Sequence, residues 1–305
     1  MRVFVTGATG YIGSAVAHQL LTAGHSVVGL ARTAQKAQQL RDKGIEPLPG
    51  DLADLPALVA GAQSTEATVH CASPMTMDFA YRERIEKTAV ETMLAAVAGT
   101  QKAFLYTSDQ LIYGDSAGKE APTEETPLNP LPFVAWRPAV EQRVLAYAHK
   151  GVRAMVVRAV AVFGEGKDHL TPLLIETARK QGYAFYIGDG GNPFSFVHVA
   201  DLAALYVTML EQGTPGLLLN AADDHLITTR QLAEGIASAA GLAGNTRSIT
   251  LEEATHLLGP FAQNLTFSLK ASPAKARQVL GWQARQPSIL EQLQASRQSS
   301  GNVFE

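Results

Sequence analysis

Two periods of apolar residues alternate along the first half of the chain. Short runs rich in β-branched residues have the character of strands, and most are followed by segments whose apolar residues recur at helical spacing. The first run covers residues 2–6, and Ile12, Val16 and Leu20 share one face of the helical segment 10–23. The same succession predicts strands over 26–31, 45–49, 67–71, 103–108 and 152–158, and helices over 34–43, 82–98 and 135–149. Strands that alternate with helices form right-handed crossovers, so the pattern predicts an α/β fold with a doubly wound parallel sheet.

The pattern becomes less regular after Gly164. It predicts helices over 169–181, 197–211, 229–240, 250–257, 273–280 and 287–297, and short strands near 185–187, 216–220 and 265–268. We therefore expect two domains. The first covers 1–165, with a return segment near 195–220, and a smaller C-terminal lobe covers 166–305. We expect the tail from Gln298 onward to fray, because chain ends that are not tied down are poorly ordered.

Composition narrows the class of protein. The 305 residues are 46% hydrophobic and 17% charged, which is enough for a large core and excludes a mainly disordered chain. A net charge of −3 argues against nucleic acid or an anionic membrane surface as the main partner. No apolar run reaches the ~18 residues of a membrane span. The single Cys71 can form no internal disulfide, so we expect a cytoplasmic protein.

A glycine motif, T-G-A-T-G-Y-I-G, begins at Thr6. Because it stands so near the start of the sequence, we expect no signal peptide. Gly7 permits a tight turn from strand to helix, and Gly10 lets backbone N–H groups approach a pyrophosphate at the helix N-terminus. Gly13 lets the helix pack closely on the sheet. Because the motif follows a strand and opens a helix, it predicts a dinucleotide site. We assign to this site Gly7, Thr9, Gly10, Tyr11, Ile12 and Gly13.

Further motifs make the chain resemble the extended branch of the short-chain dehydrogenase/reductase superfamily, of the NAD-dependent epimerase/dehydratase kind. The resemblance covers nearly the whole chain and implies a Rossmann-type sheet with a smaller C-terminal substrate-binding lobe. On this basis residues 1–165 would bind the cofactor and 166–305 would complete the substrate site. The motifs are Gly50-Asp51-Leu52, His70-Cys71-Ala72-Ser73-Pro74, Leu111-Ile112-Tyr113-Gly114, Arg158 to Gly164 and Ser195 to Ala203.

The resemblance also implies roles for single residues. Asp51 and Leu52 should hold the adenine, while Ala72 and Ser73 should line the cofactor floor. Ala159 and Val162 should approach the nicotinamide, and we add Thr107 to the cofactor-binding set.

The end of the second strand indicates which dinucleotide is bound. NAD-specific members place there an acidic residue that accepts the ribose hydroxyls of the adenosine. Here the segment reads Leu30-Ala31-Arg32-Thr33, with no carboxylate to repel a 2′-phosphate. Arg32 can hold that phosphate, with Lys36 nearby. The sequence therefore predicts NADP(H) as the cofactor.

The catalytic positions of the superfamily are changed. Its enzymes usually carry a Ser or Thr, with a Tyr and a Lys spaced Y-x-x-x-K on one helix face. The Tyr exchanges a proton with the substrate oxygen, and the Lys holds the nicotinamide ribose. This sequence contains no Y-x-x-x-K. The flanking motifs place Phe133 at the Tyr position, Arg137 at the Lys position and Asp109 at the Ser/Thr position.

These substitutions restrict the chemistry. Phe133 has no proton to donate, whereas Arg137 stays charged and can still bind the nicotinamide ribose. Losing a positioned acid costs about 10²–10⁴ in rate, so an ordinary ketone would be reduced poorly. Asp109 is the candidate replacement. It would act as an acid if protonated, or stabilise a cationic iminium if ionised, and the sequence leaves both open. Tyr113 is a second candidate proton donor.

We expect the substrate pocket at the carboxyl ends of the strands, between the two domains. Its mostly apolar lining suits a small hydrophobic substrate, and no metal-ligand spacing occurs in the chain. The sequence thus favours an NADPH-dependent oxidoreductase that acts on a carbonyl, an imine or an activated alkene. The alternatives are an NADP(H)-binding sensor or regulator without turnover, and an epimerase, dehydratase or lyase. A homodimer through the helices 82–98 and 135–149 is expected from the resemblance. The predicted lining is Pro74, Met75, Asp109, Gln110, Phe133, Phe163, Tyr186 and Phe196.

Overall fold

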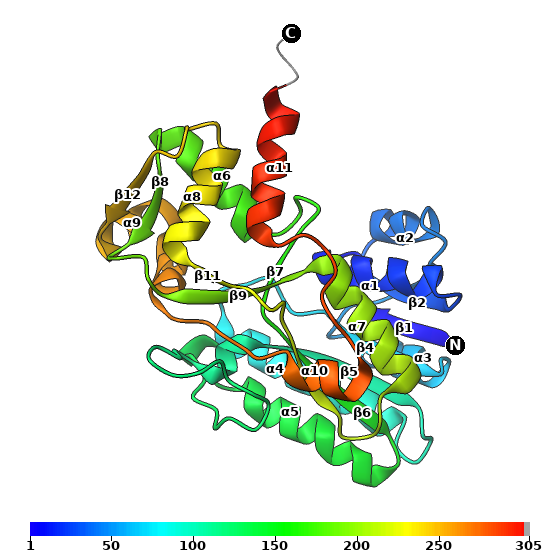
Figure 1. Cartoon of the computed structure of the whole chain (residues 1–305). Helices are drawn as coiled ribbons and strands as arrows, with labels where there is room; N and C mark the ends of the chain where they lie inside the picture. Colours follow the sequence, from blue (N-terminus) through cyan, green and yellow to red (C-terminus); the bar gives the residue numbers. More distant parts are fainter. Residues whose placement is uncertain (302–305) are drawn as a thin grey trace.

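A seven-stranded parallel sheet, built mainly from the N-terminal half of the chain, organises the fold (Figure 1). The computed structural model describes the backbone of residues 1–301 and the side chains of residues 1–296. The strand order is β10-β6-β5-β4-β1-β2-β3, and each neighbouring pair runs parallel, which confirms the predicted doubly wound sheet. The strands are β1 (Arg2–Thr6), β2 (Ser26–Ala31), β3 (Glu46–Pro49), β4 (Ala67–His70), β5 (Ala103–Asp109), β6 (Arg153–Ala159) and β10 (Leu218–Ala221).

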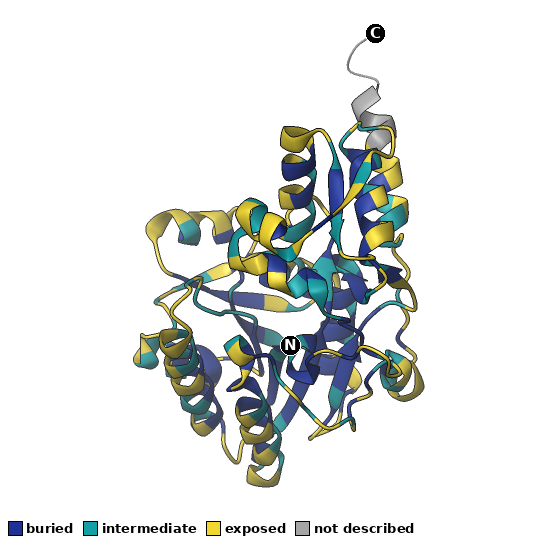
Figure 2. Ribbon diagram, turned by 90° about the vertical axis from the view of Figure 1, so that its left-hand side faces the viewer, coloured by how far each residue is buried: buried dark blue, intermediate teal, exposed yellow. Residues whose placement is uncertain are grey.

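Helices cover both faces of this sheet. One face carries α1 (Tyr11–Thr22), α2 (Ala34–Arg41) and α7 (Val199–Gln212), whose apolar residues join a buried cluster around Val5 and Leu205. The other face carries α3 (Leu55–Gln63), α4 (Phe79–Ala96) and α5 (Arg137–Ala146), packed around Phe4 and Phe104. Figure 2 shows the strands buried between helices whose outer faces are exposed. The strand order reverses between β1 and β4, and such a reversal opens a crevice at the carboxyl ends of the strands.

A second core holds the C-terminal lobe together, centred on Phe194, Phe196 and Ile236. Two small sheets contribute to it, ordered β11-β9-β7 and β12-β8. Their strands are β7 (Ala161–Phe163), β8 (Ala184–Ile187), β9 (Pro193–His198), β11 (Leu226–Thr228) and β12 (Thr246–Ile249). The helices of this part are α6 (Leu170–Gln181), α8 (Thr229–Ala239), α9 (Leu251–Leu258), the 3₁₀ helix η4 (Gly259–Thr266) and α11 (Ile289–Gly301). The chain returns to the large sheet through β10, against which α10 (Ala274–Leu280) packs.

Several elements differ from the expectation. Helix α3 was not predicted, because Pro56 and Gly61 weaken its helical character, yet Asp54 caps its first turn. The strand expected over 265–268 is wrong, since η4 runs through Thr266. Residues 193–198 form β9, so α7 begins later than the helix predicted over 197–211.

The expected frayed tail lies partly outside the described residues. Helix α11 extends through Gly301, past Gln298, and residues 302–305 of the expected tail lie outside the described part. In the part of the chain that is described, every helix is too short or too polar to cross a membrane.

Candidate functional site

The residues assigned to the cofactor lie at the carboxyl edge of the parallel sheet. They follow or end six neighbouring strands, because parallel strands all finish at the same edge. The glycine motif follows β1, and Arg32 and Lys36 follow β2. Asp51 and Leu52 follow β3, and Ala72 and Ser73 follow β4. Thr107 lies in β5, whereas Ala159 ends β6 and Val162 lies in β7.

The glycine turn has the geometry of an anion cradle. Gly7 has φ 76°, and a Cβ added there would lie 3.0 Å from the backbone nitrogen of Ala72. A Cβ on Gly13 would lie 2.2 Å from the carbonyl oxygen of Gly7, so neither position tolerates a side chain. Gly10 caps α1 without a side-chain hydrogen bond, and the first turn contains no acidic residue. The N–H groups of that turn are therefore suited to the pyrophosphate of a dinucleotide.

The turn that follows β2 carries positive charge at the surface. Arg32 is exposed, and Thr33 caps α2 by accepting a hydrogen bond from the Lys36 backbone nitrogen at 3.2 Å. Across the same edge, the Asp51 Oδ1 accepts hydrogen bonds from the backbone nitrogens of Ala53 and Asp54. Asp51 thus shapes its own loop, while Arg32 and Lys36 remain in reach of an anion.

Asp109 and Arg137 meet at the end of β5. Arg137 Nη1 lies 3.0 Å from Asp109 Oδ2, and Arg137 Nη2 lies 3.6 Å from Glu86 Oε2. Arg137 and Glu86 are buried, while the Asp109 side chain keeps 25% of its surface exposed. Burial alone would lower the pKa of Arg137, but Asp109, Tyr106 and Glu86 raise it above its ordinary value. The site therefore holds a permanent cation between two carboxyl groups.

Glu86, on α4, is a member of this cluster that the sequence analysis missed. Its Oε1 accepts a hydrogen bond from the Tyr106 hydroxyl at 2.5 Å, and its Oε2 accepts one from the Ser73 hydroxyl at 3.1 Å. Burial raises the pKa of Glu86, against the opposing effect of Arg137. A signal existed in the sequence, because Glu86 occupies the same helix face as the apolar residues Val90 and Met93.

Polar side chains under the crevice are bonded to one another. The Thr107 hydroxyl lies 2.6 Å from the Tyr206 hydroxyl and 3.4 Å from the Cys71 sulfur. Thr6 Oγ1 lies 2.8 Å from His70 Nδ1, and burial lowers the pKa of His70 to about 3. His70 is therefore neutral at physiological pH.

Tyr113 lies in a separate buried network. Its hydroxyl donates to Asn220 Oδ1 at 2.7 Å and accepts from Arg158 Nη1 at 2.7 Å. Arg158 in turn forms a buried ion pair with Glu141 at 2.6 Å. Burial raises the pKa of Tyr113 to about 12. The structure thus gives this hydroxyl two protein partners and offers no support for its assignment as a proton donor.

The residues expected to line the substrate pocket divide into two groups. Pro74, Phe133 and Tyr186 are half-buried, and Met75 is 85% exposed. Gln110 and Phe196, by contrast, are core residues. The Gln110 amide, oriented by its surroundings, donates to the Leu269 carbonyl and accepts from the Ala161 backbone.

The aromatic pair expected in the wall also belongs to the second core. Phe196 packs edge-on against Phe163, and a shared apolar cluster explains why both are buried. Phe163 borders a cavity of about 290 Å³ between α6, α8 and α11. It therefore lies beside these helices and not in the wall of the expected pocket.

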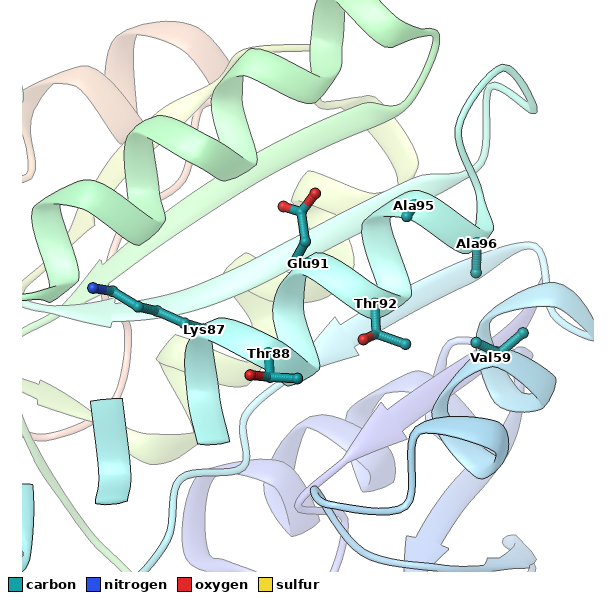
Figure 3. A pocket seen from close by; sticks show the side chains of 7 residues that line it. All are labelled: Val59, Lys87, Thr88, Glu91, Thr92, Ala95 and Ala96. Carbon is teal, nitrogen blue, oxygen red and sulfur yellow. The ribbon is translucent and has the colours of Figure 1, made fainter. Parts of the chain in front are cut away.

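A groove of about 690 Å³ lies elsewhere, along α3 and α4 (Figure 3). It contains none of the residues predicted for the site. Its lining residues are Val59, Lys87, Thr88, Glu91, Thr92, Ala95 and Ala96. Among residues 1–296, no group of three or more His, Cys, Asp or Glu side chains is arranged to hold a metal ion.

Known proteins share both sequence and fold with this chain. The model of the NAD dependent epimerase/dehydratase family matches residues 3–222. An uncharacterized protein of Schizosaccharomyces pombe is 33% identical over 297 residues, covering 96% of this chain and 98% of that protein. The 2-alkyl-3-oxoalkanoate reductase of Stenotrophomonas maltophilia is 26% identical over 224 residues, covering 71% of this chain and 67% of that protein. The crystal structure of Thermus thermophilus UDP-glucose 4-epimerase in complex with NAD has a TM-score of 0.80 at 22% identity, covering 100% of each chain.

The environment of Cys71 predicts a thiol that reacts slowly. Burial raises the pKa of Cys71 to about 11, although its contacts with Thr107 and Tyr206 oppose the shift. We expect 5,5′-dithiobis(2-nitrobenzoate) to react at pH 8 roughly 100-fold more slowly with the folded protein than with the urea-unfolded protein, whose thiol has a pKa of about 8.5. Between pH 8 and 10 the folded rate should rise by about two orders of magnitude, since the thiolate fraction rises that much. A folded rate that levels off below pH 9 would contradict this assignment.

Proposed function

The chain belongs to the NAD dependent epimerase/dehydratase family, and we propose that it is an NADPH-dependent oxidoreductase that works without the usual catalytic tyrosine. Its substrate is small and largely apolar, with a carbonyl, an imine or an activated alkene as the reducible group. The observation that carries the proposal is the Asp109–Arg137 pair at the end of β5. The pair brings charge to the carboxyl edge of the sheet, where the glycine turn suits a dinucleotide.

The residues that would hold the cofactor come from the loops after β1, β2 and β4 and from the start of α5. The first turn of α1 would bind the pyrophosphate, Arg32 and Lys36 would bind the 2′-phosphate, and Ala72 would border the floor. Bound nicotinamide supplies the hydride. Arg137, whose guanidinium already contacts two carboxyl groups, would keep its remaining hydrogen-bonding capacity for the nicotinamide ribose.

Asp109 supports an imine more strongly than a ketone. Its Oδ1 accepts a hydrogen bond from the Leu111 backbone nitrogen at 2.8 Å, and its Oδ2 lies 3.0 Å from Arg137 Nη1. With donors on both oxygens, the carboxyl group is better placed to hold negative charge than to deliver a proton. A negative charge stabilises an iminium cation before it accepts a hydride.

The stoichiometry of the reaction agrees with this reading. An iminium group carries its proton before reduction begins, so hydride addition to carbon yields a neutral amine without a further proton. A ketone would instead form an alkoxide and need a donor, for which Phe133 has no suitable group. The 2-alkyl-3-oxoalkanoate reductase among the relatives supports reduction as the reaction type.

The proposal includes a homodimer in which α4 and α5 of two copies pack together. Glu91 on α4 accepts two hydrogen bonds of 2.6 Å from Arg143 on α5, which fixes the two helices as one surface. Thr88, Thr92 and Ala95 give the α4 groove short side chains, and short side chains permit close approach of another helix (Figure 3).

The direct test is oxidation of NADPH, followed at 340 nm, with a panel of ketones, cyclic imines and activated alkenes and with products identified by mass spectrometry. We expect turnover with imines and little with unactivated ketones. A protein that binds NADPH but turns over none of the three classes would overturn the proposal in favour of a sensor without turnover.

Removing the charge of Asp109 should stop the reaction without disturbing the cofactor. We expect Asp109→Asn to lower kcat by about 10²–10⁴, because the charge that stabilises the iminium is lost. The dissociation constant for NADPH, measured by fluorescence titration, should stay within about threefold. Unchanged kcat would remove Asp109 from the mechanism.

The dinucleotide preference should depend on Arg32. We expect Arg32→Gln to weaken NADPH binding by roughly 10-fold or more, since one charge-assisted hydrogen-bonding partner of the 2′-phosphate is lost. NADH binding should stay nearly constant. Arg41→Gln is the matched control, because Arg41 is another exposed arginine at the far end of α2. Equal losses for NADPH and NADH would show that Arg32 does not read the 2′-phosphate.

A further inference from the structure

Arg82 is a second arginine beside the cluster formed by Asp109, Arg137 and Glu86. It lies in the first turn of α4, one turn before Glu86, and its side chain is half-buried. Its charge interacts with those of Arg137, Glu86 and Asp109, which places it at the same end of the sheet. Its guanidinium carbon lies 5.9 Å from the centre of the Phe79 ring, and that ring lies 6.0 Å from the ring of Phe133.

Arg82 differs from Arg137 in forming no ion pair among residues 1–296, although the Nε of each arginine is buried without a hydrogen-bond partner. Both nearby carboxyl groups, Glu86 and Asp109, lie within ion-pair distance of Arg137. Within residues 1–296 no acidic side chain pairs with Arg82, and its Nε is buried without a hydrogen-bond partner. A buried guanidinium nitrogen without a hydrogen-bond partner is unfavourable, and a bound anion would satisfy it.

The local charge balance also favours an anion. Burial and the charge of Arg137 lower the pKa of Arg82, yet a guanidinium remains charged at neutral pH. The cluster therefore presents a negative end at Asp109 and a positive end at Arg82.

We propose that Arg82 binds a carboxylate on the substrate, so that the preferred substrates are imines whose carbon skeleton carries a carboxylate. The substrate class rests on the proposed function above, whereas the anion site rests on Arg82 alone. The planar fork of a guanidinium matches the two oxygens of a carboxylate. The iminium end would face Asp109 and the carboxylate end would face Arg82, while Phe79 and Phe133 would contact the apolar part.

A matched pair of cyclic imines tests the substrate class. 1-Pyrroline-2-carboxylate and 2-methyl-1-pyrroline share the ring and differ in the carboxylate. We expect the carboxylated imine to have the higher kcat/KM by roughly 10- to 100-fold, the range of a charge-assisted hydrogen bond. Arg82→Gln should abolish that advantage, mainly through KM, and leave 2-methyl-1-pyrroline within about twofold. Equal losses on both imines, or no loss on either, would overturn the proposal.

Two further variants separate charge recognition from structure. Arg84→Gln removes a neighbouring exposed arginine that contacts the Tyr81 ring. It should leave kcat/KM unchanged for both imines. Arg82→Lys keeps the positive charge without the planar guanidinium. Its preference for the carboxylated imine should lie between those of the unaltered protein and Arg82→Gln. Thermal unfolding of each variant verifies that it folds, and if Arg82→Gln does not fold, Arg82→Lys decides the question by the same comparison.

A binding measurement distinguishes failure of the anion site from failure of the proposed function. Pyrrole-2-carboxylate is planar and has no reducible imine, and its binding to the NADPH-saturated protein is measured by calorimetry. We expect Arg82→Gln to weaken this binding at least 10-fold, with pyrrole itself unaffected. Arg82-dependent binding without turnover of either imine would retain the anion site and overturn the imine as the substrate class. Binding that is absent, or equal in both proteins, would overturn the anion site.

Discussion

The position of the Arg137 guanidinium between Asp109 and Glu86 constrains the whole carboxyl edge of the sheet. A buried cation must be compensated, and removing one partner of such a group costs about 3–5 kcal/mol. The three side chains come from α5, β5 and α4, so the contact fixes the relative positions of three elements. Tyr106 and Ser73 extend it by donating hydrogen bonds to Glu86.

The same contact determines what the site can offer a substrate. Arg137 is committed to its carboxyl groups, which leaves Asp109 as the partly exposed negative group and Arg82 as the unpaired positive one. The Phe79 ring lies beside Arg82 and 6.0 Å from the ring of Phe133, so apolar surface adjoins these charges. Such an arrangement orients a substrate by its charge distribution, so that positioning contributes to catalysis where a proton donor is lacking.

The sequence predicted much of this arrangement, because its strongest signals are local. The glycine spacing predicted the tight turn after β1, and the register assigned from the flanking motifs paired Arg137 with the site where Asp109 ends β5. Glu86 and Arg82 were missed because they come from a helix whose rotation about its axis is set by packing on β5. Phe196 was assigned to the pocket wall while no strand was predicted over 193–198, so the packing of its ring into the second core was not foreseen.

Residues 86, 109 and 137 cannot change independently during evolution. A neutral residue at 109 would leave the guanidinium with only the more distant Glu86, and a shorter cation at 137 would not span both carboxyl groups. Each single exchange reduces the compensation of a buried cation, at some cost in stability. We therefore expect substitutions at these three contacting positions to be energetically coupled rather than additive.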